Sequence, residues 1–173
     1  MSEAIYRDAF CSYCGTVHTS VKYPKMCEFC NNVTYLNAPA VGVGLVTLND
    51  GLLVVQRAIP PHIGGWALPS GYKELHETWE AGIAREVFAV DADTIILAGD
   101  RSETRSVRNA NNGSVLIFGL CAPIVVPEPV QFKMDFENSA AKIITSPIDL
   151  CFPHHQELAD WYFGHMSKDL KGD

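Results

Sequence analysis

The sequence lacks any long apolar run: no stretch approaches the roughly 20 residues that a membrane-spanning helix needs. It also lacks a basic excess, since 13 Lys and Arg stand against 20 Asp and Glu and give a formal net charge of -7. A general nucleic-acid binder normally has a basic face, so this balance argues against a nucleic-acid partner. The opening residues MSEAIYRDAF lack a charged segment followed by an apolar one, which is not the pattern of a secretory signal. We therefore expect a cytoplasmic protein without a membrane partner.

Four of the six cysteines form two C-x2-C pairs, Cys11 with Cys14 and Cys27 with Cys30. Each pair can place two thiolates on one tight turn, and two facing turns complete a tetrahedral four-sulfur site for zinc. Gly15 suits the tight backbone that follows the first pair. Four thiolates leave no open coordination position, so we expect a structural zinc ion. The alternative interpretation is four buried or reactive thiols without metal.

The chain of 173 residues is long enough for one well-buried domain and a small module. The cysteine-bearing N-terminal segment is polar, and the Asn-Ala-Pro stretch at 37–39 is typical of a linker. We therefore place a zinc ribbon at residues 1–36 and an α/β domain at residues 37–173. Patterning predicts a hairpin over 41–57, helices over 78–90 and 154–168, a short strand within 66–70, and strands over 94–99, 114–126 and 143–145.

The stretch from Gly71 to Asp93, GYKELHETWEAGIAREVFAVDAD, resembles the Nudix signature G-x5-E-x7-R-E-U-x-E-E-x-G-U, where U is a bulky aliphatic residue. Gly71, Glu77, Arg85, Glu86 and Val87 are in register with it. The resemblance is strongest to zinc-ribbon Nudix proteins, which include pyrophosphatases acting on FAD, ADP-ribose and NADH. It implies a mixed β-sheet sandwiched between helices, with the zinc ribbon in front of it.

The resemblance also implies roles for individual residues. Glu86, with the carbonyl oxygen of Ser70, would bind a catalytic magnesium or manganese ion, and the Arg85–Glu77 pair would brace the loop against the helix. Glu86, Glu77 and Arg85 are therefore the predicted catalytic residues. Arg57 and Gly71 are the predicted substrate-binding residues.

The signature is degenerate at its centre. Ala89 and Val90 stand where it has two glutamates, and His76 stands where glycine is usual. Neither an alanine nor a valine side chain can ligate a cation, so we expect weaker metal binding and slower catalysis. Glu137 lies a few residues before the position of a late-loop glutamate found in similar proteins, and we do not assign it as a replacement.

Two functions follow from this sequence. The first is a divalent-metal-dependent hydrolase of a nucleoside diphosphate linked to another moiety, a dinucleotide or nucleotide-sugar pyrophosphatase that acts on a substrate such as FAD or ADP-ribose. The alternative is a catalytically impaired Nudix-fold module that binds a nucleotide or has a regulatory role. In both cases the expected partner is a small nucleotide diphosphate derivative. The resemblance is also compatible with a homodimer.

Overall fold

The computed structural model describes residues 8–88, 105–108, 113–121, 123–125, 129–130, 132 and 134–169. Contacts divide the chain into two compact units, Met1–Ala38 and Pro39–Asp173. None of the helices within the described ranges is long and apolar enough to cross a membrane.

The first unit has very little regular structure. Strand β1 (Lys25–Met26) pairs antiparallel with β2 (Val33–Thr34), and a single bridge joins Phe10 to Val17. Among residues 8–38 the buried side chains are those of Cys11, His18, Lys25 and Cys27. A core of aliphatic or aromatic side chains is therefore absent from the described part of this unit, and two of the four cysteines, Cys11 and Cys27, lie in its interior.

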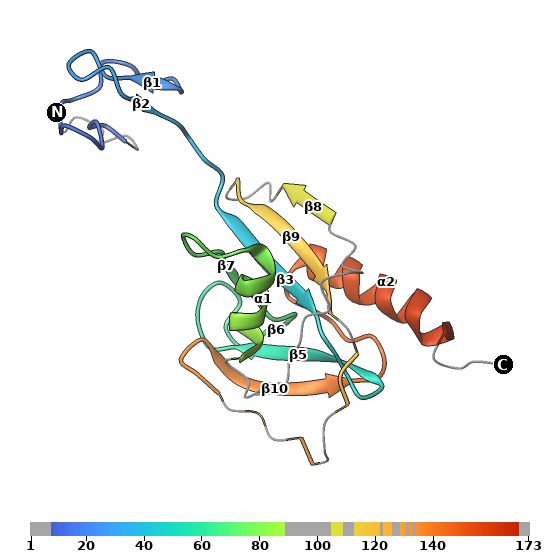
Figure 1. Ribbon diagram of the computed structural model, residues 1–173. Coiled ribbons are helices and arrows are strands. Elements are labelled where there is room, and N and C mark those ends of the chain that lie inside the picture. The colour runs from blue at the N-terminus through green and yellow to red at the C-terminus, as the bar shows by residue number, and fades with distance from the viewer. Residues whose placement is uncertain are drawn as a thin grey trace. The chain divides into compact units, whose positions relative to one another are not determined.

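The described residues of the second unit form two four-stranded sheets (Figure 1). One has the order β10-β5-β4, with β6 also paired to β5, and all of its pairings are antiparallel. The other has the order β7-β3-β9-β8 and is mixed, because β3 runs parallel to β9. The strands are β3 (Ala40–Leu45), β4 (Thr47–Leu48), β5 (Gly51–Arg57), β6 (Trp66–Ala67), β7 (Ser70–Tyr72), β8 (Arg105–Arg108), β9 (Val115–Leu120) and β10 (Asn138–Ile144).

Helix α1 (Trp79–Phe88) lies close against one face of the mixed sheet (Figure 1). A methyl group at Gly42 or Gly44 would lie 2.8 Å from an Ile83 side-chain carbon, and one at Gly119 would lie 2.6 Å from the Trp79 ring. These glycines therefore form a flat platform on β3 and β9, and the helix backbone approaches the strands closely because no Cβ atoms stand between them.

Helix α2 (Pro153–Asp169) packs against the opposite face of the same sheet. Successive residues of a strand point to opposite faces, so Val43 and Leu45 face α2 while the intervening glycine faces α1. Ala159 and Tyr162 of α2 are buried against this cluster. The mixed sheet is thus sandwiched between two helices, as the sequence predicted.

The local predictions agree with most described elements. The hairpin predicted over 41–57 is shorter than expected: β4 pairs with β5, with Asn49 in the turn at φ 51°. Residues 40–45 form β3, which pairs with β7 and β9 in the other sheet. The helix predicted from residue 78 is confirmed: α1 begins after Thr78, whose hydroxyl accepts a hydrogen bond from the Ala81 N–H at 3.2 Å and so caps the helix. Strand β10 is longer than the predicted 143–145, because its pairing with β5 runs from Asn138 to Ile144. Residues 94–99 lie outside the described residues.

Candidate functional site

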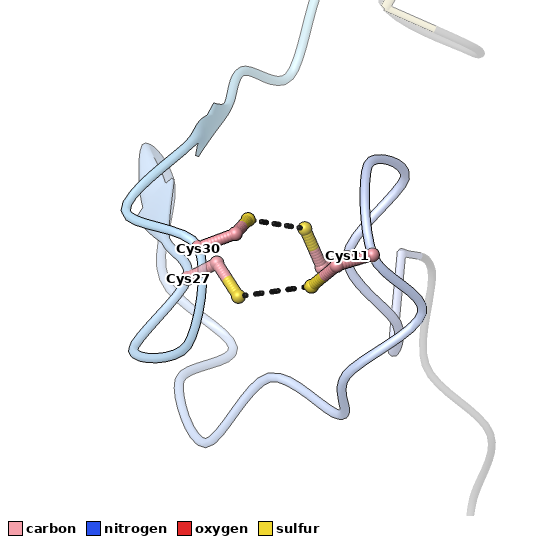
Figure 2. Close-up of side chains that lie close together, drawn as sticks. Cys11, Cys27 and Cys30 are labelled. Carbon is pink, nitrogen blue, oxygen red and sulfur yellow. Dashed lines mark hydrogen bonds between the residues drawn. The ribbon is translucent and has the colours of Figure 1, made fainter.

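The four predicted zinc ligands come together in the first unit. Their ligand atoms all lie within 4.8 Å of one another. The Sγ atoms are 3.7 Å apart in the Cys11–Cys30 pair and 3.6 Å apart in the Cys14–Cys27 pair (Figure 2). A tetrahedron with Zn–S bonds of about 2.3 Å has edges of about 3.8 Å, whereas a disulfide would need about 2.0 Å. The spacing therefore fits a metal ion at the centre of four sulfurs.

The two C-x2-C pairs sit on two similar turns, which face each other in Figure 2. Gly15 N–H donates to the Cys11 carbonyl, and Asn31 N–H donates to the Cys27 carbonyl, both at 2.9 Å. Gly15 has a φ of 76° and Asn31 a φ of 58°, so each turn is completed by a left-handed residue. Sequence inspection found Gly15 but missed Asn31, which occupies the equivalent place after the second pair.

The environment of the sulfurs favours the thiolate form at two positions. The side-chain hydrogen bond with Thr16, followed by one from its backbone, lowers the pKa of Cys14 to about 6. The backbone N–H of Asn32 lowers the pKa of Cys30. Hydrogen bonds from backbone N–H groups lower the pKa of Cys27, but burial and the neighbouring sulfurs together outweigh them and raise it to about 11. Binding of a metal ion to all four sulfurs would therefore release protons.

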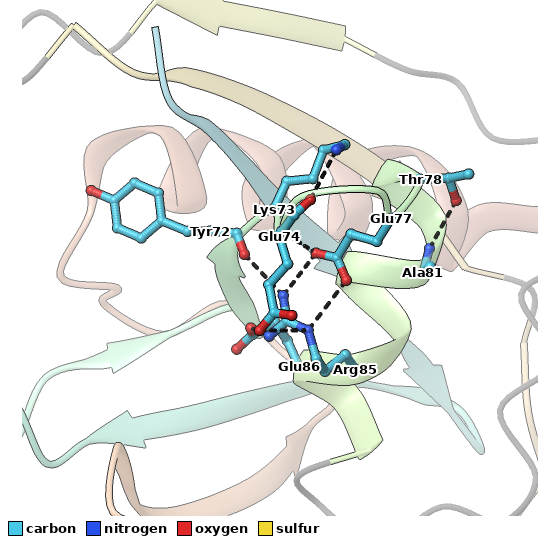
Figure 3. A network of polar contacts seen from close by, with 8 residues as sticks. All are labelled: Tyr72, Lys73, Glu74, Glu77, Thr78, Ala81, Arg85 and Glu86. Carbon is cyan, nitrogen blue, oxygen red and sulfur yellow. Dashed lines mark hydrogen bonds and ion pairs between the residues drawn. The ribbon is translucent and has the colours of Figure 1, made fainter. Parts of the chain in front are cut away.

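In the second unit, the Arg85 guanidinium lies at the centre of a polar network (Figure 3). Its Nη2 donates to Glu77 Oε1 and to the Tyr72 carbonyl, both at 2.9 Å, and its Nε donates to Glu77 Oε2 at 3.3 Å. The Glu77 carboxylate also accepts the backbone N–H of Glu74 at 2.5 Å. These contacts join the loop after β7 to helix α1, which is the bracing arrangement expected for this pair.

Glu86 lies beside this network on α1. Its carboxylate accepts a hydrogen bond from Arg85 Nη1, and its side chain is only 16% exposed. A methyl group at Gly71 would overlap the Glu86 carboxylate, so the glycine leaves the space that this side chain occupies. Burial raises the pKa of Glu86, even though the Arg85 charge lowers it. The carboxylate is thus held in a place where its negative charge is poorly solvated.

Two further acids act on Glu86 from another part of the chain. The charges of Glu137 and Asp135 both raise its pKa, after the effects of burial and Arg85. Both residues precede β10, whose Ala141 and Ile143 share an apolar cluster with α1. Sequence reasoning assigned no role to Glu137 and did not consider Asp135, because only the pairing of β10 with β5 brings this turn near the helix.

Arg57 has contacts that the sequence did not suggest. Its Nε donates to the Pro61 carbonyl at 2.7 Å and its Nη2 to the Pro60 carbonyl at 3.2 Å. Its guanidinium carbon also lies 5.2 Å from the centre of the Phe152 ring. Arg57 therefore fastens the loop between β5 and β6 to the segment before α2. Its contact with a substrate stays a prediction.

The remaining predicted positions divide into two groups. Ser70 begins β7, where it pairs with Val43, and Gly71 follows it directly below the Glu86 carboxylate. Ala89 and Val90, where the missing glutamates would stand, lie outside the described residues.

The fold resembles those of several solved structures. A Nudix hydrolase from Nitrosomonas europaea superposes with a TM-score of 0.68 at 22% identity, and the match covers 90% of each chain. The fold is that of the Nudix hydrolases. A bifunctional NMN adenylyltransferase/ADP-ribose pyrophosphatase from Francisella tularensis, complexed with AMP and a manganese ion, gives a TM-score of 0.62 at 22% identity. That match covers 75% of this chain and 42% of the other.

Sequence comparison agrees with the structural one. A MutT-like protein from Streptomyces ambofaciens is 38% identical over 81 residues, which are 46% of this chain. The chain spans about half, 49%, of the length of this curated relative. No family model matches the chain. The sequence match and the Nudix fold together support assignment to the Nudix family, and the zinc-ribbon subgroup stays a prediction.

Proposed function

We propose that this chain is a divalent-metal-dependent hydrolase of a nucleoside diphosphate linked to another moiety, such as ADP-ribose or FAD. Hydrolysis adds water across the P–O–P linkage and gives a nucleoside monophosphate and a second phosphorylated product. The observation that carries the proposal is the largely buried Glu86 carboxylate, which lies against Gly71 and is acted on by the charges of two further acids.

The residues around Glu86 fit a hard divalent cation. Magnesium and manganese prefer oxygen ligands, and Glu86, the Ser70 carbonyl and the acids Glu137 and Asp135 offer oxygen donors. Burial raises the pKa of Glu86, and a bound cation would favour its ionised form. A bound cation would supply neutralisation of the phosphate charges and a more acidic water. Glu137 and Asp135 would then compensate in part for the glutamates replaced by Ala89 and Val90.

The other predicted residues have supporting roles in this proposal. Arg85 and Glu77 hold the loop after β7 in place, and Arg85 donates to Glu86 so that its carboxylate keeps one orientation. Gly71 leaves the space that the Glu86 carboxylate occupies, and in this proposal a phosphate group would bind beside that carboxylate. In the first unit, Cys11, Cys14, Cys27 and Cys30 would bind a structural zinc ion.

The test uses the full chain with ADP-ribose, FAD and NADH, each with magnesium or manganese, and measures AMP release by chromatography. Glu86→Gln should lower kcat/KM by about 100-fold or more, because even the outer partners of metal ligands contribute 10–100-fold. Glu80→Gln on the same helix is the matched control and should keep wild-type activity. Absence of AMP release from every substrate would reject the hydrolase.

One observation favours the alternative of a nucleotide-binding module without catalysis. Of the helix carboxylates that bind metal in the signature, this chain retains Glu86. The Arg85 guanidinium already neutralises the charge of that carboxylate. This alternative predicts that ADP-ribose raises the Tm without AMP release. It also predicts that Ala89→Glu combined with Val90→Glu creates activity.

The homodimer and the cytoplasmic location stay predictions. Native mass spectrometry of the full chain would measure the number of subunits.

A further inference from the structure

Residues 68–69 form a short crossover between the two sheets of the second unit. Before them β6 pairs with β5 in the antiparallel sheet, and after them β7 pairs with β3 in the mixed sheet. Where a chain leaves one sheet for another, its buried backbone groups need partners outside the strand ladders. Leu68 is fully buried, and its backbone N–H is one of these groups.

The start of α2 supplies the partner. His155 is buried, and its Nδ1 accepts the Leu68 N–H at 3.1 Å. Because a backbone N–H can only donate, the ring is the neutral tautomer with its proton on Nε2. Just before the helix, the Cys151 N–H donates to the Trp66 carbonyl at 2.8 Å. The chain entering the crossover is therefore fastened both to β5 and to the start of α2.

The strand after the crossover directs two carbonyl groups away from its sheet. The Pro69 carbonyl and the Lys73 N–H both bond to β3, at 2.9 Å. Hydrogen-bonded residues alternate along an antiparallel strand, so Ser70 and Tyr72 direct their backbone groups away from β3. The Tyr72 carbonyl accordingly accepts a hydrogen bond from Arg85 Nη2 at 2.9 Å (Figure 3). The Ser70 carbonyl, two residues earlier, points to the same side of β7.

This side of β7 is where Glu86 lies. A methyl group at Gly71 would be 2.1 Å from the carbon of the Glu86 carboxylate. The Ser70 carbonyl is bonded to the nitrogen of Gly71, so it is next to that carboxylate. Between Leu68 and Ser70 there is only Pro69, whose ring fixes its φ. A displacement of the Leu68 backbone is therefore passed on directly to the Ser70 carbonyl.

We propose that His155 is a positioning residue for the cation site at Glu86. By holding the Leu68 N–H, it fixes the Ser70 carbonyl in place as an oxygen ligand beside the carboxylate. The inference rests on the proposed cation site and deepens it, because it gives a part in that site to α2, which lies outside the signature. His155 itself contacts neither the cation nor the substrate.

Three variants of the full chain separate positioning from general stability. His155→Leu keeps an apolar side chain in the buried place and removes the acceptor. His155→Asn restores an acceptor, because its Oδ1 is as many bonds from the backbone as Nδ1. Tyr162→Phe is the matched control, since it removes another buried hydrogen bond of α2, the one with Thr47 at 3.2 Å. Thr47 belongs to β4, so this bond does not hold the crossover.

Two measurements are made without nucleotide. Manganese affinity is measured by electron paramagnetic resonance, and hydrogen exchange of the Leu68 amide by NMR. His155→Leu should raise the Kd for manganese about 10-fold, because the partners that orient metal ligands contribute about 10–100-fold to affinity. Its Leu68 amide should also lose protection from exchange. His155→Asn should restore both properties, and Tyr162→Phe should change neither while it lowers the free energy of unfolding.

The wild type provides a test that needs no variant. If the Leu68 hydrogen bond favours cation binding, a bound cation must favour that hydrogen bond by the same factor. Magnesium should therefore slow exchange of the Leu68 amide in the wild-type chain. Unchanged exchange would overturn the inference even where His155→Leu does not fold.

The remaining outcomes separate this inference from the proposed function. If His155→Leu weakens manganese binding and Tyr162→Phe does not, while the wild type releases no AMP, the positioning role stands and the hydrolase fails. If the wild type releases AMP and His155→Leu keeps its manganese affinity, the hydrolase stands and the positioning role fails. Equal loss of manganese affinity in His155→Leu and Tyr162→Phe, or no manganese binding by the wild type, would also reject the positioning role.

Discussion

The two units of this chain hold their folds by different means. Among residues 8–38, the interior consists of two cysteines, a histidine and a lysine. The second unit instead buries two apolar clusters, one on the α2 side of the mixed sheet and one that includes α1. A segment of this length cannot bury enough apolar surface to fold alone, so cross-links or metal ligands replace the core. The comparison shows that one chain can contain a unit built around a four-cysteine cluster and a unit built around apolar packing.

The strongest test removes one sulfur. Cys27→Ser should abolish ordered structure in the first unit, because three sulfurs cannot complete the tetrahedral site that replaces its core. Zinc content should fall from about one ion per chain to near zero. Hydrogen exchange followed by mass spectrometry should show lost protection in residues 8–38 and unchanged protection in the second unit.

Cys121→Ser is the matched control for this variant. Cys121 is buried in an apolar cluster of the second unit, and burial raises its pKa to about 12, as expected for an unmetallated core thiol. Its replacement should leave the zinc content unchanged. Equal zinc loss in both variants would show that the four-sulfur site has been assigned wrongly.

The next test addresses packing in the second unit. Gly44→Ala would place a methyl group 2.8 Å from Ile83 and 3.2 Å from Val46, so it should destabilise this unit by about 3 kcal/mol. Gly164→Ala makes the same chemical change on α2, where nothing lies within 4 Å, and should stabilise by about 0.5–1 kcal/mol.

Urea unfolding followed by tryptophan fluorescence measures both glycine variants. All three tryptophans, at positions 66, 79 and 161, belong to the second unit, so the signal reports on that unit alone. Opposite signs of the two stability changes are expected. A stabilising Gly44→Ala would mean that α1 does not approach the glycine platform as closely as described.

A smaller loss of stability is expected when the pH is lowered. Burial, followed by the Arg57 charge, lowers the pKa of His155 to about 3, and its Nδ1 accepts the Leu68 N–H at 3.1 Å. The unfolded chain protonates this histidine near pH 6.5 and the folded chain does not, so stability falls as the pH decreases from about 6.5 towards 3. Between pH 7 and 5 the loss should be about 2 kcal/mol.

His155→Gln keeps an acceptor for the Leu68 N–H but does not titrate in this range. Its tryptophan-monitored unfolding should therefore depend less on pH than that of the wild type over the same interval. Parallel pH dependence in the two proteins would show that His155 is not the source of the acid sensitivity.

The smallest effect concerns the backbone of the loop before α1. His76 has a φ of 70°, a conformation that costs an L-residue about 1 kcal/mol or more and glycine much less. His76→Gly should stabilise the second unit by about 0.5 kcal/mol, after the entropy that glycine adds to the unfolded chain. His62 has a similar φ of 63°, but its ring contacts that of Phe152. His62→Gly removes this contact and should therefore increase the stability less than His76→Gly.

Local features were predictable from the sequence. The cap at Thr78, the β4–β5 hairpin and the two C-x2-C turns each depend on residues close together in the chain. The spacing of Glu77, Arg85 and Glu86 likewise follows from a loop and a single helix. Such a pattern can be recognised in the sequence because fewer than about ten residues separate the interacting groups along the chain.

Other features required the tertiary structure. Arg57 fastens a loop because Phe152 lies beside it, and the turn at Asp135 and Glu137 reaches Glu86 because β10 pairs with β5. No short-range pattern records either contact, since about 50 to 95 residues separate the partners along the chain.

The sequence by itself determined the chemistry that each segment offers: four thiols in two C-x2-C pairs, and a helix in which Arg85 and Glu86 follow Glu77 at the spacing of the signature. The tertiary structure decided which side chains from distant parts of the sequence lie near these groups and alter their pKa. The physical reason is that turn and helix propensities act between near neighbours, whereas the environment of a buried carboxylate depends on every strand that packs around it.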